Sequence, residues 1–140
     1  MAYIDTSVLV ACYCPEALSE KAERAVRRAR PPAISPLVEV EFASALSLKV
    51  RTGGMDAETA GRVLAAFRLH IDEQRFQVVP VEAKAYALAS EWLGSFTAPL
   101  RTVDALHLAT AHAAGLPLVT ADKALADSAK RFGVKHRFIS

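Results

Sequence analysis

Short apolar runs alternate along the chain with longer segments that carry apolar residues at helical spacing. The short runs predict β-strands at residues 2–4, 33–34, 76–79, 116–120 and 134–139. Helices are expected after Asp5, between Pro15 and Arg30, from Pro36 to about Thr52, after Asp56, at 82–93, at 103–114 and at 124–132. Strands that alternate with helices pair in parallel. The pattern therefore predicts an α/β/α sandwich around a central, mainly parallel sheet.

Two acidic residues stand where predicted strands end. Asp5 follows the first strand, and Asp122 comes just after the strand 116–120. Ligands of parallel sheets gather beyond the carboxyl ends of the strands. If these two strands are neighbours, both carboxylates lie at the same edge of the sheet.

Two further acidic residues are unusual for their surroundings. Glu41 lies in a helix that is apolar nearly all round, which predicts a buried helix and a carboxylate that needs a partner. Glu39 is an alternative that periodicity does not separate from Glu41. Asp104 falls in the first turn of the helix 103–114, where an acid is also favoured by the helix dipole. Asp5 and Asp122 have ordinary roles as helix caps open to them as well.

The four acids together suggest chemistry that none suggests alone. Carboxylates that converge repel one another unless a cation lies between them. Mg²⁺ and Mn²⁺ accept such hard oxygen ligands and assist phosphodiester hydrolysis. Spacing alone leaves open whether Asp5, Glu41, Asp104 and Asp122 converge.

Composition restricts the class of protein. The chain has 140 residues, of which 52% are hydrophobic and 23% charged, so a single domain over residues 1–140 with a real core is expected. A net charge of +2 permits a nucleic-acid partner without requiring one. Cys12 and Cys14 are too close in sequence for a disulfide, and we interpret them as small buried side chains. With no signal peptide and no membrane span visible, we expect a cytoplasmic protein.

Four sequence blocks resemble one known family. They are Tyr3-Ile4-Asp5-Thr6-Ser7, Glu41-Phe42-Ala43-Ser44-Ala45-Leu46, Asp104-Ala105-Leu106-His107-Leu108-Ala109 and Leu118-Val119-Thr120-Ala121-Asp122-Lys123. In this order and at these separations, the blocks resemble the PIN-domain family, specifically the VapC-like toxins of type II toxin–antitoxin pairs. The resemblance covers essentially the whole chain.

The resemblance implies a function and a set of catalytic residues. It implies a Mg²⁺- or Mn²⁺-dependent endoribonuclease with Asp5, Glu41, Asp104 and Asp122 as metal-binding catalytic acids, and it selects Glu41 over Glu39. It also implies a homodimer and a cognate antitoxin that covers the site. Because the family includes DNA-acting members, a DNA-directed nuclease remains an alternative to RNA cleavage.

Neighbours of the acids acquire expected roles under this interpretation. Thr6, Ser7 and Thr120 would orient the carboxylates that bind the metal, although roles as caps and strand-end residues explain them equally well. His107 follows Asp104 by three residues and shares its side of the helix, so it either faces the site or is a packed structural histidine. Arg101 and Lys123 are the candidate contacts to RNA phosphates because each is close in sequence to a site acid.

Phosphoaspartate enzymes and a non-cutting scaffold are the alternatives to a nuclease. Phosphoaspartate enzymes of the haloacid-dehalogenase or receiver type need a second acid near the first strand, and Asp5-Thr6-Ser7 lacks it. A PIN-like scaffold that binds RNA or a partner without cutting remains open, and in that case the carboxylates act only as caps.

Overall fold

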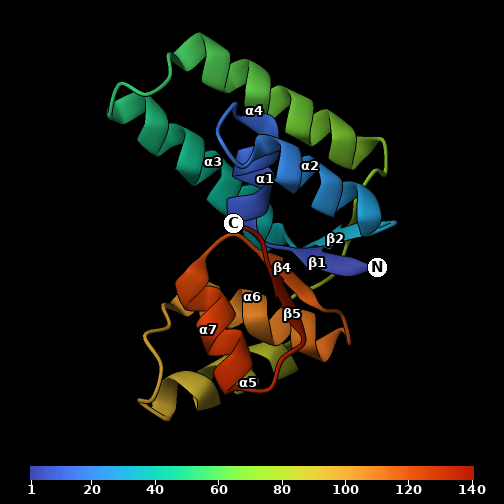
Figure 1. Ribbon diagram of the computed structural model, residues 1–140, viewed down its shortest axis with the longest axis vertical. Helices are drawn as coiled ribbons and strands as arrows, with labels where there is room; N and C mark the ends of the chain where they lie inside the picture. The colour runs from blue at the N-terminus through green and yellow to red at the C-terminus, as the bar shows by residue number, and fades with distance from the viewer.

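A five-stranded sheet runs through the middle of the molecule, as the computed structural model of residues 1–140 shows (Figure 1). Its strands are β1 (Ala2–Ile4), β2 (Pro32–Ile34), β3 (Gln77–Val78), β4 (Leu118–Thr120) and β5 (His136–Phe138). Their order is β3-β2-β1-β4-β5, and every neighbouring pair is parallel. The predicted α/β class is confirmed, and the sheet is parallel throughout.

Seven helices cover the two faces of the sheet. On one side lie α1 (Thr6–Tyr13), α2 (Ser19–Arg28), α3 (Pro36–Arg51) and α4 (Ala57–Asp72). On the other side lie α5 (Ala83–Gly94), α6 (Thr102–Ala113) and α7 (Lys123–Arg131) (Figure 1). Alanines such as Ala85, Ala89 and Ala105 line the contact between α5 and α6, where small side chains let the helices pack closely. No helix is long and apolar enough to cross a membrane.

The strands β1 and β4 are direct neighbours, as the placement of the acids required. Tyr3 pairs with Leu118 and Ile4 with Val119, and the amide of Asp5 donates to the carbonyl of Val119 at 3.0 Å. Asp5 and Thr120 therefore leave the sheet at the same carboxyl edge, which is where open α/β sheets bind ligands.

Three glycines end helices where the sequence predicted. Gly53, Gly115 and Gly133 have φ of 78°, 69° and 66°, which is the left-handed region that residues with a Cβ rarely adopt. After each glycine the next amide bonds back to a carbonyl of the preceding helix, for example Leu116 to Ala111 at 2.9 Å. These Schellman-type ends direct the chain from α6 into β4 and from α7 into β5.

Some predicted boundaries were too generous. The second helix begins at Ser19 rather than Pro15, because the Ser19 hydroxyl accepts from the Glu16 amide at 2.9 Å and donates to the Cys14 carbonyl, which holds a turn there. The strand β4 begins at Leu118 because Pro117, which has no N–H, precedes it. The strand β3 has only two residues.

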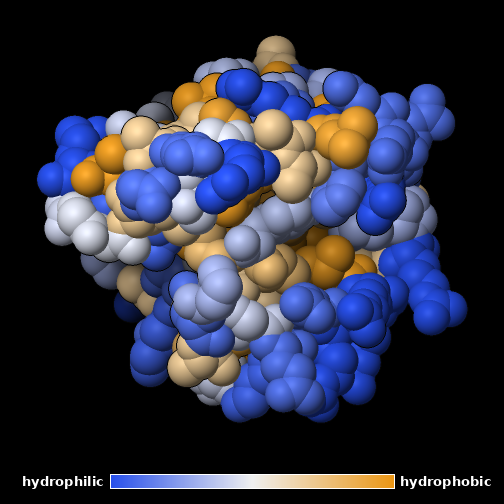
Figure 2. All heavy atoms as spheres, turned by 90° about the horizontal axis from the view of Figure 1, so that it is seen from above, coloured by the Kyte–Doolittle hydropathy of each residue, from blue (hydrophilic) through white to orange (hydrophobic).

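The expectation that α3 is a buried helix was wrong. Its buried stripe is Val38, Phe42 and Leu46, whereas Val40 is 70% exposed and Leu48 is 53% exposed. Figure 2, which looks onto the α3–α4 side from above, shows apolar side chains scattered among hydrophilic ones on this face. Only one side of α3 meets the core, because α1 and α4 cover that side and nothing covers the other.

Candidate active site

Asp5 is held at the sheet edge by two hydroxyl groups. The residue is 4% exposed, and its Oδ2 accepts from Ser7 at 2.6 Å and from Thr120 at 2.9 Å. Ser7 also accepts from the amide of Ala121 at 3.0 Å, which ties the start of α1 to the end of β4. Asp5 is the N-cap residue of α1, but its side chain makes no capping bond. The capping role that the sequence allowed is therefore absent, and the carboxylate is oriented by Ser7 and Thr120 instead.

Glu41 enters from α3 and is held in a comparable way. Its Oε1 accepts from Thr6 at 2.7 Å and contacts Nε2 of His107 on α6. Burial raises the pKa of Glu41, but the hydrogen bond and charge of His107 and the bond from Thr6 outweigh it, so the net shift is downward. Glu41 is therefore ionised at neutral pH. Glu39, the alternative, makes no side-chain hydrogen bond or ion pair.

A buried chain of hydrogen bonds supports Glu41 from behind. His107 is fully buried, and its Nδ1 lies 2.6 Å from the hydroxyl of Tyr3, which in turn lies 2.7 Å from Ser35 Oγ. Burial raises the pKa of Tyr3, so its hydroxyl stays protonated. Two arrangements of protons satisfy all of these atoms. With neutral His107, Ser35 donates to Tyr3 and Tyr3 donates to Nδ1; with charged His107, Nδ1–H donates to Tyr3 and Tyr3 donates to Ser35. In both arrangements, Nε2–H donates to Glu41. The two placements expected for His107 are therefore compatible, since the residue is packed in the core and also contacts Glu41.

Asp104 has a raised pKa. Burial first, and then the charges of Asp5, Asp122 and Glu41, raise its pKa to about 6, with His107 opposing. Asp104 lines a cavity of about 670 Å³ together with Glu41, Asp122 and Arg101, and Asp5 is not among the residues that line it. Asp5 instead lies beside Glu41, since ligand atoms of the two residues are within 4.8 Å of each other.

Asp122 is both a cap and a wall of this cavity. Its Oδ1 accepts from the amide of Leu125 at 3.2 Å, so the capping role that the sequence allowed is real. The amide of Asp122 donates to Thr120 at 3.0 Å, which links it to the hydroxyl that holds Asp5. Capping and facing the cavity are compatible, since only one of the two carboxylate oxygens makes the cap.

The donor set fits a divalent cation. In Asp5, Glu41 and Asp122, hydrogen bonds from the protein reach one oxygen of each carboxylate and leave the other without a donor, and Asp104 accepts none. Ligand atoms of Asp5, Glu41 and His107 all lie within 4.8 Å of one another. Since both nitrogens of His107 already have partners, the available ligands are carboxylate oxygens, which is the set that Mg²⁺ and Mn²⁺ prefer.

The two candidate RNA contacts differ in position. Arg101 lines the cavity and has no carboxylate within ion-pair distance. Lys123 forms an ion pair with Asp127 at 3.0 Å and is not among the residues that line the cavity. Of the two cations, only Arg101 is therefore placed to meet a phosphate at the acids.

Sequence reasoning missed Tyr3 and Ser35. The sequence did hold a signal for the Tyr3–His107 contact. A tyrosine in a short buried strand needs a hydrogen-bond partner for its hydroxyl, and the sequence offered no partner for His107 either. Pairing them required knowing that β1 lies beside α6, and the distance of 104 residues between them hides that contact.

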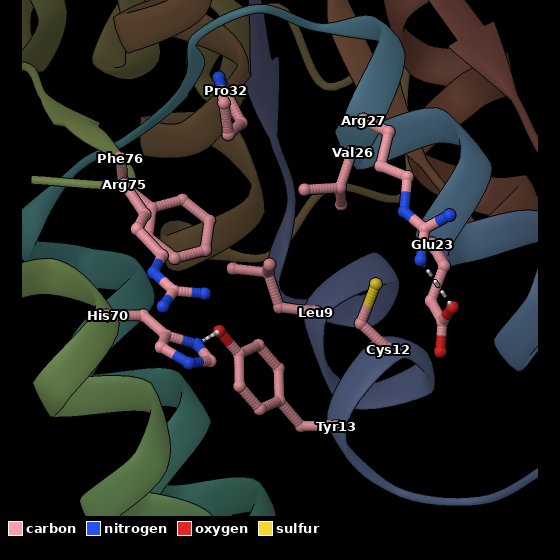
Figure 3. Close-up of a pocket in the computed structure, with 10 residues that line it drawn as sticks. All are labelled: Leu9, Cys12, Tyr13, Glu23, Val26, Arg27, Pro32, His70, Arg75 and Phe76. Atoms are coloured by element: carbon pink, nitrogen blue, oxygen red, sulfur yellow. Dashed lines mark hydrogen bonds and ion pairs between the residues drawn. The ribbon is translucent and has the colours of Figure 1, made fainter.

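A second cavity, about 560 Å³, lies among α1, α2 and α4 and contains none of the four acids. Figure 3 shows the Tyr13 hydroxyl bonded to Nδ1 of His70 at 2.6 Å, with the Cys12 thiol nearby. Burial raises the pKa of Cys12 to about 11 and that of Tyr13 to about 12. Both groups are protonated at neutral pH, so this cavity offers no ready nucleophile.

The chain is similar to known proteins in sequence and in fold. Ribonuclease VapC46 of Mycobacterium tuberculosis is 34% identical over 135 residues, which cover 94% of this chain and 92% of the relative. The solved structure of VapC20 from the same organism, described as a sarcin-ricin loop cleaving toxin, has a TM-score of 0.69 at 24% identity, covering 91% of this chain and 95% of that one.

A toxin–antitoxin complex from Klebsiella pneumoniae has a TM-score of 0.64 at 19% identity, with 87% of both chains covered. At such identities the two structures show the shared fold alone. A sequence profile of the PIN domain matches residues 2–131. The chain belongs to the PIN-domain family.

Proposed function

We propose that this protein is a metal-dependent endoribonuclease that acts as the toxin of a toxin–antitoxin pair. One observation carries the catalytic part of this proposal. Glu41, Asp104 and Asp122 line one cavity at the carboxyl edge of the sheet, and Asp5 offers a ligand atom within 4.8 Å of one from Glu41. Four mutually repelling carboxylates at such an edge are costly to the fold unless they hold a cation.

The relatives support RNA as the substrate. The 34% identical relative from Mycobacterium tuberculosis is named a ribonuclease, and the similar VapC20 is described as cleaving the sarcin-ricin loop. Arg101 beside the acids supplies one positive charge for a phosphate. We propose that this chain likewise hydrolyses RNA phosphodiester bonds.

Asp5, Glu41, Asp104 and Asp122 would hold Mg²⁺ or Mn²⁺. Such an ion, when bound, supplies Lewis acidity and charge neutralisation for phosphodiester hydrolysis. The protein's own part is orientation: Ser7 and Thr120 fix Asp5, and Thr6 and His107 fix Glu41. Their bonds occupy one oxygen of each carboxylate and leave the other for the ion.

Partners and location follow as parts of the same proposal. The fold is shared with a toxin–antitoxin complex, so we propose a cognate antitoxin that covers the site. A homodimer stays a prediction, which light scattering at micromolar concentration would test. The proposal treats residues 1–140 as a single PIN-like domain that works in the cytoplasm, where its RNA substrate is.

The test is cleavage by the purified, antitoxin-free protein. Total RNA is incubated with it in Mn²⁺ or Mg²⁺, beside EDTA, Asp104→Asn and Asp72→Asn. Discrete cuts are expected with wild type and with Asp72→Asn, because Asp72 is exposed at the end of α4 and lines neither the cavity of the acids nor any neighbouring hollow. EDTA and Asp104→Asn should abolish them.

Other outcomes would identify the alternatives. Metal-dependent cutting of single-stranded DNA but not of RNA would mean a DNA-directed nuclease. RNA binding without cleavage in either metal, by a folded protein, would mean a non-catalytic PIN-like scaffold. Equal cleavage by wild type and Asp104→Asn would overturn the assignment of the site.

A further inference from the structure

A third hollow adjoins the cavity that Glu41, Asp104 and Asp122 line. It measures about 540 Å³ and is bordered by Pro99, Ala124, Asp127, Ser128, Lys130 and Arg131; we call it the α7 groove. The cavity of the acids also includes Pro99 and Ala124 in its wall. The two hollows therefore share a boundary, formed by the loop before α6 and the first turn of α7, which lie on the same side of the molecule (Figure 1).

The cavity of the acids and the α7 groove form one continuous path, and its two ends carry opposite charge. The inner end holds Glu41, Asp104 and Asp122. At the outer end, Lys130 and Arg131 are exposed and have no carboxylate within ion-pair distance. The one acid of the α7 groove, Asp127, is paired with Lys123 at 3.0 Å, which offsets its charge. An anionic ligand is thus attracted at the outer end.

The lining shows which part of a nucleic acid the groove suits. No aromatic side chain borders it, so bases have no surface on which to stack. Free lysine and arginine side chains bind phosphates regardless of sequence. We propose that the α7 groove holds the sugar–phosphate backbone of the RNA on one side of the cleaved bond, with Lys130 and Arg131 as its phosphate contacts. This inference rests on the proposed function and adds a positioning surface to it.

The helix gives the reach of this contact. Arg131 lies seven residues after Ala124 on α7, which is about 10 Å along a helix at about 1.5 Å per residue. That length corresponds to about three stacked nucleotides at about 3.4 Å each. A substrate must therefore extend about three nucleotides past the boundary at Ala124 to use both cations, so a dinucleotide bound at the acids does not reach them.

The test compares two matched pairs of cations. Lys130 and Arg131 occupy the last turn of α7, and Arg27 and Arg28 occupy the last turn of α2. Lys130→Gln/Arg131→Gln and Arg27→Gln/Arg28→Gln therefore remove the same charge and the same favourable helix-end interaction. Each pair is placed in the Asp104→Asn protein, which we expect to bind RNA without cutting it, and thermal melting verifies that each variant is folded.

The readout is the salt dependence of binding to an oligouridylate of about 12 nucleotides, a length within the usual range for single-strand sites. Each lost phosphate contact lowers the slope of log K against log salt by about 0.7, so Lys130→Gln/Arg131→Gln should lower it by about 1.4. Arg27→Gln/Arg28→Gln should leave the slope unchanged. A dinucleotide should bind both variants alike.

Two results would overturn the inference. One is an unchanged slope in Lys130→Gln/Arg131→Gln, which would mean that this surface is free or serves a protein partner. The other is an equal fall in both pairs, which would mean a general charge effect. Failure of the nuclease proposal is separate, because it appears as absence of cleavage by wild type, whereas this test measures binding alone.

Discussion

Nε2 of His107 contacts Oε1 of Glu41, although 66 positions separate the two residues in the chain. Because Nδ1 of the same ring bonds to Tyr3, the imidazole can turn neither toward nor away from the carboxylate without breaking a buried hydrogen bond. His107 is therefore a positioning residue, and its effect on chemistry passes through Glu41.

Replacing this histidine should weaken metal binding. We expect His107→Gln to raise the Mn²⁺ concentration needed for half-maximal cleavage by about 10- to 100-fold, the usual cost of losing the partner of a ligand. His112→Gln on the same helix is the control, since His112 is exposed. A purely structural role would instead lower the melting temperature and leave the Mn²⁺ requirement unchanged.

The hydroxyls of Ser7 and Thr120, which both donate to Oδ2 of Asp5, should act as a unit. Ser7→Ala and Thr120→Ala each remove one donor to Oδ2 and should each lower the cleavage rate by about tenfold. The double variant should fall by less than the product, because Ser7 and Thr120 hold the same atom. Ser90→Ala, an exposed position on α5, provides the baseline. If the rate loss of the double variant equals the product of the two single losses, the two hydroxyls work independently.

Removing the charge of Asp104 should stabilise the metal-free protein. Its pKa is about 6 in the folded state and about 3.9 unfolded, so folding favours the protonated form. That contribution is complete below about pH 4 and is lost as pH rises through about 6. Discounted for solvent screening, the penalty at pH 7.5 is about 1 kcal/mol, or about 3 °C in melting temperature.

In EDTA at pH 7.5, Asp104→Asn should therefore melt about 3 °C above wild type, and the difference should vanish at about pH 4. Asp127→Asn is the control, because it removes an exposed acid from an ion pair. A lower melting temperature for Asp104→Asn at pH 7.5 would contradict repulsion among the four acids.

Cleavage should be sensitive to pH near 6 when the metal is scarce. Ion binding requires the ionised carboxylate, and the raised pKa of Asp104 means that this form declines below about pH 6. At limiting Mn²⁺, we expect the rate to fall toward tenfold per pH unit below that value. Saturating Mn²⁺ should move the decline to lower pH, because the ion competes with the proton. If the pH dependence of the cleavage rate does not change with Mn²⁺ concentration, the decline belongs to a group other than Asp104.

The sequence could predict the framework of the fold because its signals are local. Short apolar runs marked the strands, and glycines in the left-handed region ended helices at Gly53, Gly115 and Gly133. The rule on carboxyl ends then placed Asp5 and Asp122 at one edge, which the pairing of β1 with β4 requires.

What the sequence could not predict depends on contacts between distant segments. Periodicity showed that α3 is apolar but not that one side lacks a cover, so the exposure of Val40 was missed. It likewise could not separate Glu41 from Glu39, because that choice depends on His107 and Thr6, which other elements supply. The resemblance selected Glu41, and the structure shows the bonds that orient it.

The order of the sheet also determines when the site comes into being during synthesis. β1 lies near the start of the chain, and its partner β4 lies near the end, just before Asp122. Asp5, which follows β1, accepts a hydrogen bond from Thr120 of β4. A nascent chain that has emerged only through α6 already carries Asp5, Glu41 and Asp104, but Asp5 then has only Ser7 to orient it, because Thr120 and Asp122 have not yet been made available. We therefore expect the proposed nuclease to become active only after β4 and Asp122 have left the exit tunnel of the ribosome.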